Sequence, residues 1–298
     1  MCTGTKCLAI SFTLILVLII AFVGCSQQSS QSNTISSADR ALAMWEVQNA
    51  MSRHAYYHQI GQHCEELEDV WVKEDGPYGD TATWTSSGGV EEGIALIKQN
   101  YCTQHLESQK QTLEQLSKFD PTIKNVPENI GAGSEYVMHT QETPVIEVAG
   151  DGQTAKGIWY SIGLAVRGTV AEGGQTSIST GWMWEKYAAD FAKEDGKWKI
   201  WHFVNVMDQA PAESGGQGRG RGEPPAGGQA GGMGSGPGQP PAGPQGRTDV
   251  DARMEARGSG RQVTRPNPDP YSWSPTVVPR IYPRFPEPYY TFSETFSY

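Results

Sequence analysis

The first half of the central region repeats apolar residues at the spacing of an α-helix. Between Ala38 and Ile60 they return every three or four positions, which predicts one long helix. The same spacing predicts helices at 64–72 and 90–116, and acidic residues at the start of the latter suit a helix N-terminus. The apolar side of the first helix should comprise Met44, Val47, Met51, Ala55 and His58.

Beyond Pro121 the pattern changes to that of β-strands. A short strand is expected at 81–85, and four longer ones at 136–148, 154–167, 182–193 and 197–207. Gly150-Asp151-Gly152 and Glu194-Asp195-Gly196 are typical of tight hairpins between successive strands. Helices followed by an antiparallel meander predict an α+β fold, in which a curved sheet packs against about three N-terminal helices.

The C-terminal third has a different composition from the central domain, which we place at 38–210. Residues 211–262 are rich in Gly and Pro and contain few large apolar side chains, so we expect a flexible linker. Residues 263–298 interleave aromatic residues with prolines, which restrict the unfolded chain and reduce the entropy lost on docking. We predict an extended tail that packs on the domain or on a neighbouring subunit.

The N-terminal segment has the pattern of an export signal. One charge, Lys6, precedes an apolar run that ends at Gly24-Cys25, and a polar stretch follows. Gly24-Cys25 resembles a bacterial lipobox, so residues 1–24 are interpreted as a lipoprotein signal peptide, Cys25 as the lipidated residue and 25–37 as a tether. The alternative is an uncleaved membrane helix. Either reading places the domain outside the cytoplasm, attached to the membrane.

Charge and cysteine content narrow the class of protein. The chain carries 33 acidic and 23 basic residues, a net charge of −10, which argues against binding nucleic acid. After removal of the signal, Cys64 and Cys102 remain besides Cys25. In an exported protein this pair either forms a disulfide or remains as two buried thiols, and the sequence leaves both open.

Three stretches carry a resemblance to a known family. Tyr187 to Ile200 contains an Asp-Gly hairpin followed by Trp-Lys-Ile, His139 to Val148 precedes Gly157-Ile158-Trp159, and Ala41 to Trp71 spans a helix pair. In this order they resemble the SnoaL-like branch of the nuclear-transport-factor-2-like superfamily, over about residues 38–208. The resemblance implies a cone-shaped domain around a pocket, which is able to form a homodimer. The family's functions range from cofactor-free dehydratases and isomerases to proteins with no known chemistry.

The resemblance also implies candidate catalytic residues. Catalytic members use a strand histidine, a carboxylate at the end of the opening helix and tyrosine hydroxyls. His139 matches the histidine and would be the base, with Tyr57 as the phenol donor; a backbone-bonding, structural His139 is the alternative. The helix carboxylate is missing, and Gly163 stands where some members carry a further acid. The other expected pocket residues are Tyr56, His58, Trp159, Tyr187 and His202.

Other polar residues bear on metal binding and on burial. His54 and His58 lie one helical turn apart with His63 nearby, a spacing that can bind zinc, but the motif fixes no Glu or Cys ligand. We therefore expect no metal and no cofactor. Glu185 and Asp190 have opposite strand parity, so we expect at least one of them to be a solvated edge charge.

Two functional hypotheses follow. In the first, the cone binds a small apolar or aromatic ligand, with proton-transfer chemistry such as dehydration or isomerisation. In the second, the domain is a non-catalytic module for binding or assembly at the cell surface. A pocket with convergent polar groups favours the first, whereas a cone filled by Trp and Tyr rings favours the second.

Overall fold

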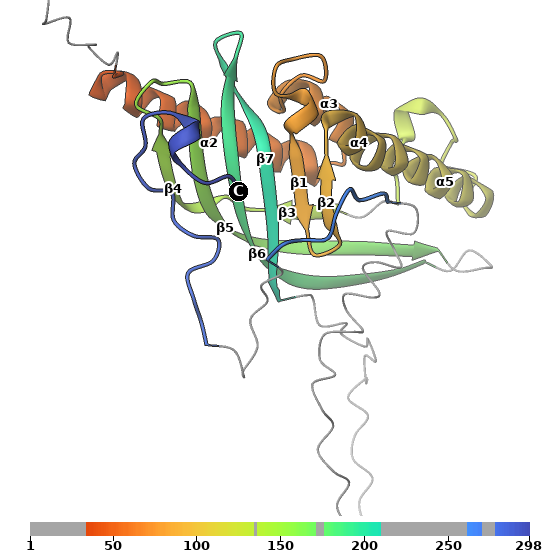
Figure 1. Cartoon of the computed structure of the whole chain (residues 1–298). Coiled ribbons are helices and arrows are strands. Elements are labelled where there is room, and N and C mark those ends of the chain that lie inside the picture. The colour runs from red at the N-terminus through yellow and green to blue at the C-terminus, as the bar shows by residue number, and fades with distance from the viewer. Residues whose placement is uncertain (1–33, 134–135, 171–175, 210–260, 270–277) are drawn as a thin grey trace, which may run out of the picture.

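The computed structural model describes residues 34–133, 136–170, 176–209, 261–269 and 278–298 (Figure 1). The predicted signal peptide, Cys25, most of the tether and nearly all of the linker lie outside these residues. Within the described part, no helix combines the length and the apolarity needed to cross a membrane.

The helical layer is formed by the first half of the chain. Helix α2 (Ser37–Gln59) begins at Ser36, whose side chain accepts a hydrogen bond from the backbone N–H of Asp39. Helix α3 (His63–Val70) follows directly. Helix α4 (Ile94–Ile97), a π-helical turn η2 (Lys98–Thr103) and helix α5 (Gln104–Phe119) then form one continuous rod. Short 3₁₀ turns lie at Gly79–Thr81 (η1), Pro127–Asn129 (η3) and Phe292–Glu294 (η4).

Two predictions about the helices are wrong. The expected helix from Val90 begins only at Ile94, because Val90 and Glu91 lie in a strand and Gly93 has a φ of 88°. The buried side of α2 consists of Ala43, Val47, Ala50, Met51 and His54. Met44, which was expected on that side, is exposed.

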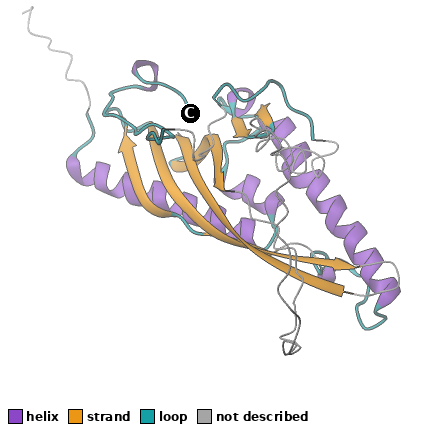
Figure 2. Ribbon diagram, turned by 90° about the horizontal axis from the view of Figure 1, so that it is seen from below, coloured by secondary structure: helices purple, strands orange, loops and turns teal. Residues whose placement is uncertain are grey.

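The strands form one mixed sheet of seven, where the pattern predicted five. They are β1 (Thr83–Ser86), β2 (Gly89–Glu92), β3 (Tyr136–His139), β4 (Glu142–Val148), β5 (Thr154–Val170), β6 (Thr176–Glu194) and β7 (Lys197–Gln209). Their order is β2-β1-β7-β6-β5-β3, with β4 also paired to β5. Only β1 and β7 pair in parallel among these described strands. The sheet curves strongly (Figure 2), which confirms the expected α+β fold.

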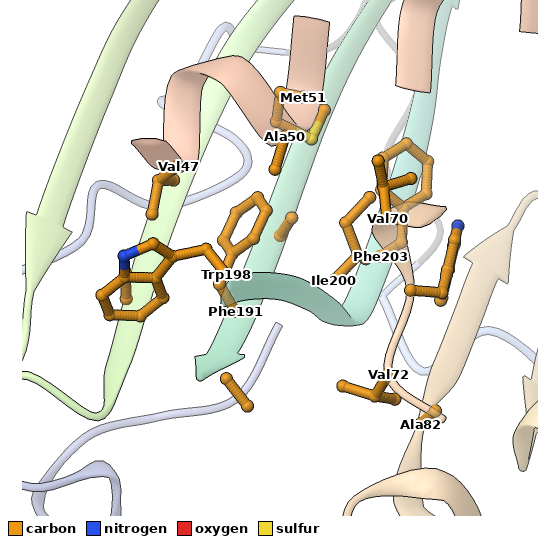
Figure 3. Packing of buried hydrophobic residues seen from close by; sticks show 14 of the residues in the cluster. Val47, Ala50, Met51, Val70, Val72, Ala82, Phe191, Trp198, Ile200 and Phe203 are labelled. Carbon is orange, nitrogen blue, oxygen red and sulfur yellow. The ribbon is translucent and has the colours of Figure 1, made fainter. Parts of the chain in front are cut away.

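One face of the sheet packs on α2 and holds the main core. Val47, Ala50 and Met51 of α2 meet Phe191 of β6 and strand β7 (Figure 3). The indole N–H of Trp159 donates to Gln48 Oε1 at 2.7 Å. Further along this face the rings of Trp71, Trp84, Tyr101, Tyr187 and Phe203 pack on one another. Aromatic side chains therefore fill much of the space under the curved sheet.

The opposite face of the sheet is covered by the C-terminal tail (Figure 1). The Tyr298 backbone N–H and the Ser297 hydroxyl donate to Asp190 Oδ2, at 2.9 and 3.1 Å. Asp190 also accepts from the fully buried Lys156 ammonium at 2.6 Å. This ammonium lies over the rings of Phe292, Phe296 and Tyr298, with 4.5, 4.5 and 5.0 Å to the ring centres.

The end of the expected linker and the start of the tail lie at the β2 edge of the sheet. Residues 261–269 pass along β2, where Val90 and Arg265 form a β-bridge and the Arg261 side chain pairs with the buried Glu91 carboxylate. Gln262 exchanges hydrogen bonds with the Asn100 side chain. The described C-terminal segments thus contact the sheet at β2, which is one edge strand, and at β5, near the other edge.

Cys64 and Cys102 form a disulfide, which resolves the alternative that the sequence left open. The bond joins the first turn of α3 to the π-helical turn, across a sequence separation of 38 residues. It therefore fixes the two helical elements that carry the polar cluster described next.

Candidate functional site: a histidine cluster between the helices and the sheet

Five of the six histidines gather on the α2 side of the sheet. The ring centres of His105 and His63 are 4.2 Å apart, those of His63 and His58 4.9 Å, and those of His58 and His139 4.7 Å. His54 lies beside this row, with 5.6 Å between its ring centre and that of His58. The row runs from α5 through α3 and α2 to the end of β3.

His139 lies at the inner end of the row and contacts three polar side chains. Its Nδ1 atom is 2.9 Å from the Tyr187 hydroxyl, 2.9 Å from Glu185 Oε2 and 3.4 Å from the Ser161 hydroxyl. The Tyr187 hydroxyl also donates to Glu185 Oε2 at 2.8 Å. His139, Ser161, Glu185 and Tyr187 are all buried. They form a histidine–carboxylate–phenol arrangement shielded from water.

The electrostatics of this arrangement keep the carboxylate ionised. Burial acts to raise the pKa of Glu185, but the hydrogen bond and charge interaction with His139, together with hydrogen bonds from Tyr187 and Asn205, hold this pKa below its usual value. Burial and the Glu185 charge raise the pKa of Tyr187 well above its usual value. At neutral pH the phenol therefore keeps its proton and acts as a hydrogen-bond donor.

A second buried carboxylate, Glu66 of α3, lies near the middle of the row. Its Oε1 is 2.7 Å from His54 Nδ1 and 3.3 Å from the Trp71 indole nitrogen. Its Oε2 accepts from the Tyr101 hydroxyl at 2.6 Å, and the same hydroxyl contacts His58 Nδ1. Burial would raise the pKa of Glu66, yet the hydrogen bond from His54 and the charge interactions with His54 and His63 lower it to about 2.

Two histidines of the row, His58 and His105, are held in the neutral form. Burial lowers the pKa of His58 well below its usual value, and the neighbouring imidazoles of His139 and His63 lower it further. Burial also lowers the pKa of His105 to about 4. Neutral imidazoles keep a lone pair for accepting a proton or binding a metal.

A solvent-accessible cleft reaches the outer end of the row. Its volume is about 400 Å³, and its lining includes His63, His105 and the disulfide between Cys64 and Cys102. The rest of the lining comes from the segment before α3, from α5 and from the loop before β3, including Gly61, Gln109, Glu128 and Ile130. The cleft therefore connects the row to solvent at the end opposite His139.

The structure brings together some of the predicted site residues. His58, His139 and Tyr187 lie within one cluster. Tyr57 faces Arg53, which carries an ion pair to Asp69, and Tyr57 does not occur among the described contacts of His139. The phenol that reaches His139 is Tyr187.

Three of the expected pocket residues are placed elsewhere. Tyr56 is 74% exposed. Trp159 is buried in the core against Gln48 and Phe191. His202 lies on the tail face, where its Nδ1 is 2.8 Å from Asp190 Oδ2.

The expectation that Glu185 or Asp190 would be a solvated edge charge is wrong. Both carboxylates are buried, Glu185 on the helix face and Asp190 on the tail face. The two side chains do point to opposite faces of the sheet, but the tail buries the second face as well. Glu66 was also missed, although its spacing of three residues from His63 on a helix was a usable signal.

Gly163 lies directly across from His139 in the β3–β5 ladder. A Cβ atom at this position would come within 2.4 Å of the Met138 carbonyl oxygen. A side chain at 163 would therefore require β3 to move away from β5. The carboxylate that approaches His139 comes instead from β6, as Glu185.

Comparison with known proteins agrees with this architecture. The family model for the SnoaL-like domain matches residues 39–204. The chain therefore belongs to the SnoaL-like domain family. No curated protein sequence matches the chain.

Several solved structures resemble the domain. A candidate scytalone dehydratase from Novosphingobium aromaticivorans is 14% identical, with 58% of this chain and 89% of that chain covered and a TM-score of 0.39. Hexachlorocyclohexane dehydrochlorinase LinA-type3 from Novosphingobium barchaimii is 17% identical, with 60% and 96% covered and a TM-score of 0.37. A candidate dehydratase of the NTF2-like family from Streptomyces avermitilis is 14% identical, with 57% and 99% covered and a TM-score of 0.41. At these identities and TM-scores the likeness assigns no activity to this chain.

Proposed function

We propose that the domain binds a small apolar or aromatic carbonyl compound beside His139 and removes a proton from the carbon next to the carbonyl. The observation that carries the proposal is the approach of both Glu185 Oε2 and the Tyr187 hydroxyl to His139 Nδ1, each at 2.9 Å, inside a buried site. A histidine oriented by an ionised carboxylate is a typical general base.

The residues divide the chemistry between them. The imidazole of His139 takes the proton, the electron pair of the broken C–H bond moves into the carbonyl to give an enolate, and Glu185 stabilises the imidazolium. In a dehydration, the enolate expels a β-hydroxyl group that receives the proton back from His139 and leaves as water. In an isomerisation, the proton returns to a different carbon. Tyr187 replaces Tyr57 as the proposed phenol because it contacts His139.

A separate observation favours the non-catalytic alternative. The rings of Trp71, Trp84 and Phe203 pack under the sheet at centre-to-centre distances of 4.9 to 6.1 Å. A cone filled in this way favours a module that uses its surface for binding or assembly. The two functions are distinguished by whether the protein exchanges protons with bound carbonyl compounds.

The test follows hydrogen–deuterium exchange at carbon. Aryl ketones and β-hydroxy ketones are incubated with the protein in D₂O, and loss of the proton signal next to the carbonyl is followed by NMR. His139→Gln should slow enzyme-dependent exchange by about 10²- to 10⁴-fold, the range for loss of a general base. His202→Gln is the matched control, because it removes a buried, carboxylate-paired histidine on the opposite face.

Two results would contradict the proposal. One is an unchanged exchange rate in His139→Gln. The other is an absence of exchange for every ketone in the panel, and ligand-induced shifts without exchange would then favour the non-catalytic binding module.

We also propose that the protein is exported and anchored through lipidated Cys25. The disulfide between Cys64 and Cys102 supports an oxidising compartment. Mass spectrometry of the mature N-terminus tests the anchor, since a chain that retains Met1 without modification would exclude it.

A further inference from the structure

Three potential metal ligands from two helices meet beside the cleft. His58 lies at the end of α2, and His63 and Glu66 lie three residues apart on one side of α3. Each offers one ligand atom, and these atoms all lie within 4.8 Å of one another. The donor set of two imidazoles and one carboxylate is one that Zn²⁺ takes in proteins, with a water at the fourth position.

One of these donors has no hydrogen-bond partner. His63 is 6% exposed, and its Nδ1 atom makes no hydrogen bond within the described part of the chain. The nearest carboxylate oxygen, Glu66 Oε2, is 3.5 Å away, beyond good hydrogen-bond distance. A buried nitrogen without a hydrogen-bond partner destabilises the folded protein, and a bound ion would offset this cost.

Neighbouring side chains hydrogen-bond to the Glu66 carboxylate and orient it, as the side chains behind the ligands of a metal site do. His54 and the Trp71 indole N–H contact Oε1 of Glu66, which leaves Oε2 on the side of His58 and His63. The Tyr101 hydroxyl bridges Glu66 Oε2 and His58 Nδ1. Tyr101 comes from the π-helical turn, and π-helical turns occur frequently at functional sites.

The cleft gives an ion a path to the ligands. His63 lines it, and the disulfide at Cys64 and Cys102 holds α3 against the π-helical turn at the same place. The cleft is also large enough to admit water to an open coordination position.

We propose that His58, His63 and Glu66 form a binding site for a divalent transition-metal ion, with Zn²⁺ as the ion that the donor set fits best. Bonds of about 2.1 Å in tetrahedral geometry set the ligand atoms roughly 3.4 Å apart. The three side chains therefore move inward on binding, and Zn²⁺ replaces the Tyr101 bridge between His58 and Glu66. The inference stands apart from the proposed proton transfer, which uses His139 at the other end of the row.

The test measures zinc binding by the purified protein without an affinity tag. The protein is treated with a chelator, dialysed, and titrated with ZnSO₄ in competition with a chromophoric chelator, and bound zinc is measured by inductively coupled plasma mass spectrometry. We expect one Zn²⁺ per chain. His63→Gln should weaken binding by more than about 100-fold, since loss of an outer contact alone costs 10- to 100-fold. His202→Gln, the matched control, should bind as the wild type does.

A second measurement uses the wild-type protein alone and does not depend on how the variants fold. Adding Zn²⁺ should shift the imidazole NMR signals of His58 and His63 and leave those of His202 unchanged. Failure to bind one equivalent of zinc would overturn the proposal. So would unchanged affinity in a folded His63→Gln, or zinc-induced shifts that spare His58 and His63.

Discussion

Asp190 joins the sheet to the C-terminal tail, and its replacement tests how the second face is held. Its carboxylate is fully buried and accepts from Lys156, Ser297 and the Tyr298 backbone, with His202 at 2.8 Å. Asp190→Asn keeps the shape but leaves the Lys156 ammonium buried without its counter-charge. Breaking a buried ion pair from one side costs about 3–5 kcal/mol.

The assay is urea unfolding followed by circular dichroism. With a urea m-value of about 2 kcal/mol/M, the loss corresponds to a midpoint roughly 1.5–2.5 M lower. Asp195→Asn is the control, because Asp195 pairs with Lys73 at the surface, and its midpoint should stay at the wild-type value. Hydrogen exchange should also show loss of protection at the Tyr298 amide in Asp190→Asn. A midpoint within about 0.5 M of wild type would refute the reasoning.

The same carboxylate contributes to the pH dependence of stability. Burial acts to raise the pKa of Asp190, but His202 and Lys156 together hold it below its usual value of 3.8. A carboxyl whose folded-state pKa is lowered contributes stability above its unfolded pKa and loses it as the pH falls through the folded one. Asp190→Asn should therefore reduce the acid sensitivity of unfolding below about pH 4. Parallel curves for the two proteins would contradict this.

Three further changes have defined outcomes. Reduction of the disulfide between Cys64 and Cys102, which closes a loop with a separation of 38 residues, should lower the free energy of unfolding by about 4 kcal/mol, and coincident urea curves with and without reductant would contradict this. Gly150→Ala places a Cβ 2.3 Å from Tyr290 Cδ2, so it should destabilise by about 1–3 kcal/mol and increase proteolysis of the tail relative to Gly88→Ala, whose Cβ meets only the Ser86 hydroxyl oxygen at 3.7 Å. Gly163→Ala should separate β3 from β5, seen as faster amide exchange in both strands, and unchanged exchange would show that the ladder absorbs the methyl group.

Hairpins were predictable because their signals are local. Asp195 and Gly196 have φ angles of 49° and 76°, values that Asp and Gly adopt most readily, and they connect β6 to β7 at the expected place. The hairpin of β1 and β2 was missed because Val90, Ile94 and Ile97 are also spaced as in a helix. The parallel pairing of β1 with β7 joins Thr83 to His202, a contact without a local signal.

The sequence predicted the histidines of the candidate site but not its carboxylates. His58 and His139 were expected in one pocket and lie 4.7 Å apart between ring centres. Glu185 was not expected in the site, because opposite strand parity predicted that at least one of Glu185 and Asp190 would face solvent. That argument assumes that one face of the sheet is exposed to solvent. In this protein a segment about a hundred residues further along the chain covers that face.

The position of the tail has a consequence for biosynthesis. During translation, Lys156 and Asp190 are made long before Phe292, Phe296 and Tyr298, the rings that enclose the ammonium. Until those residues reach the compartment in which the domain folds, the sheet carries this ion pair in water and leaves Ala188 and Val204 uncovered. Such a chain exposes apolar surface until the residues beyond the Gly- and Pro-rich segment arrive, and in this interval it is most prone to aggregation.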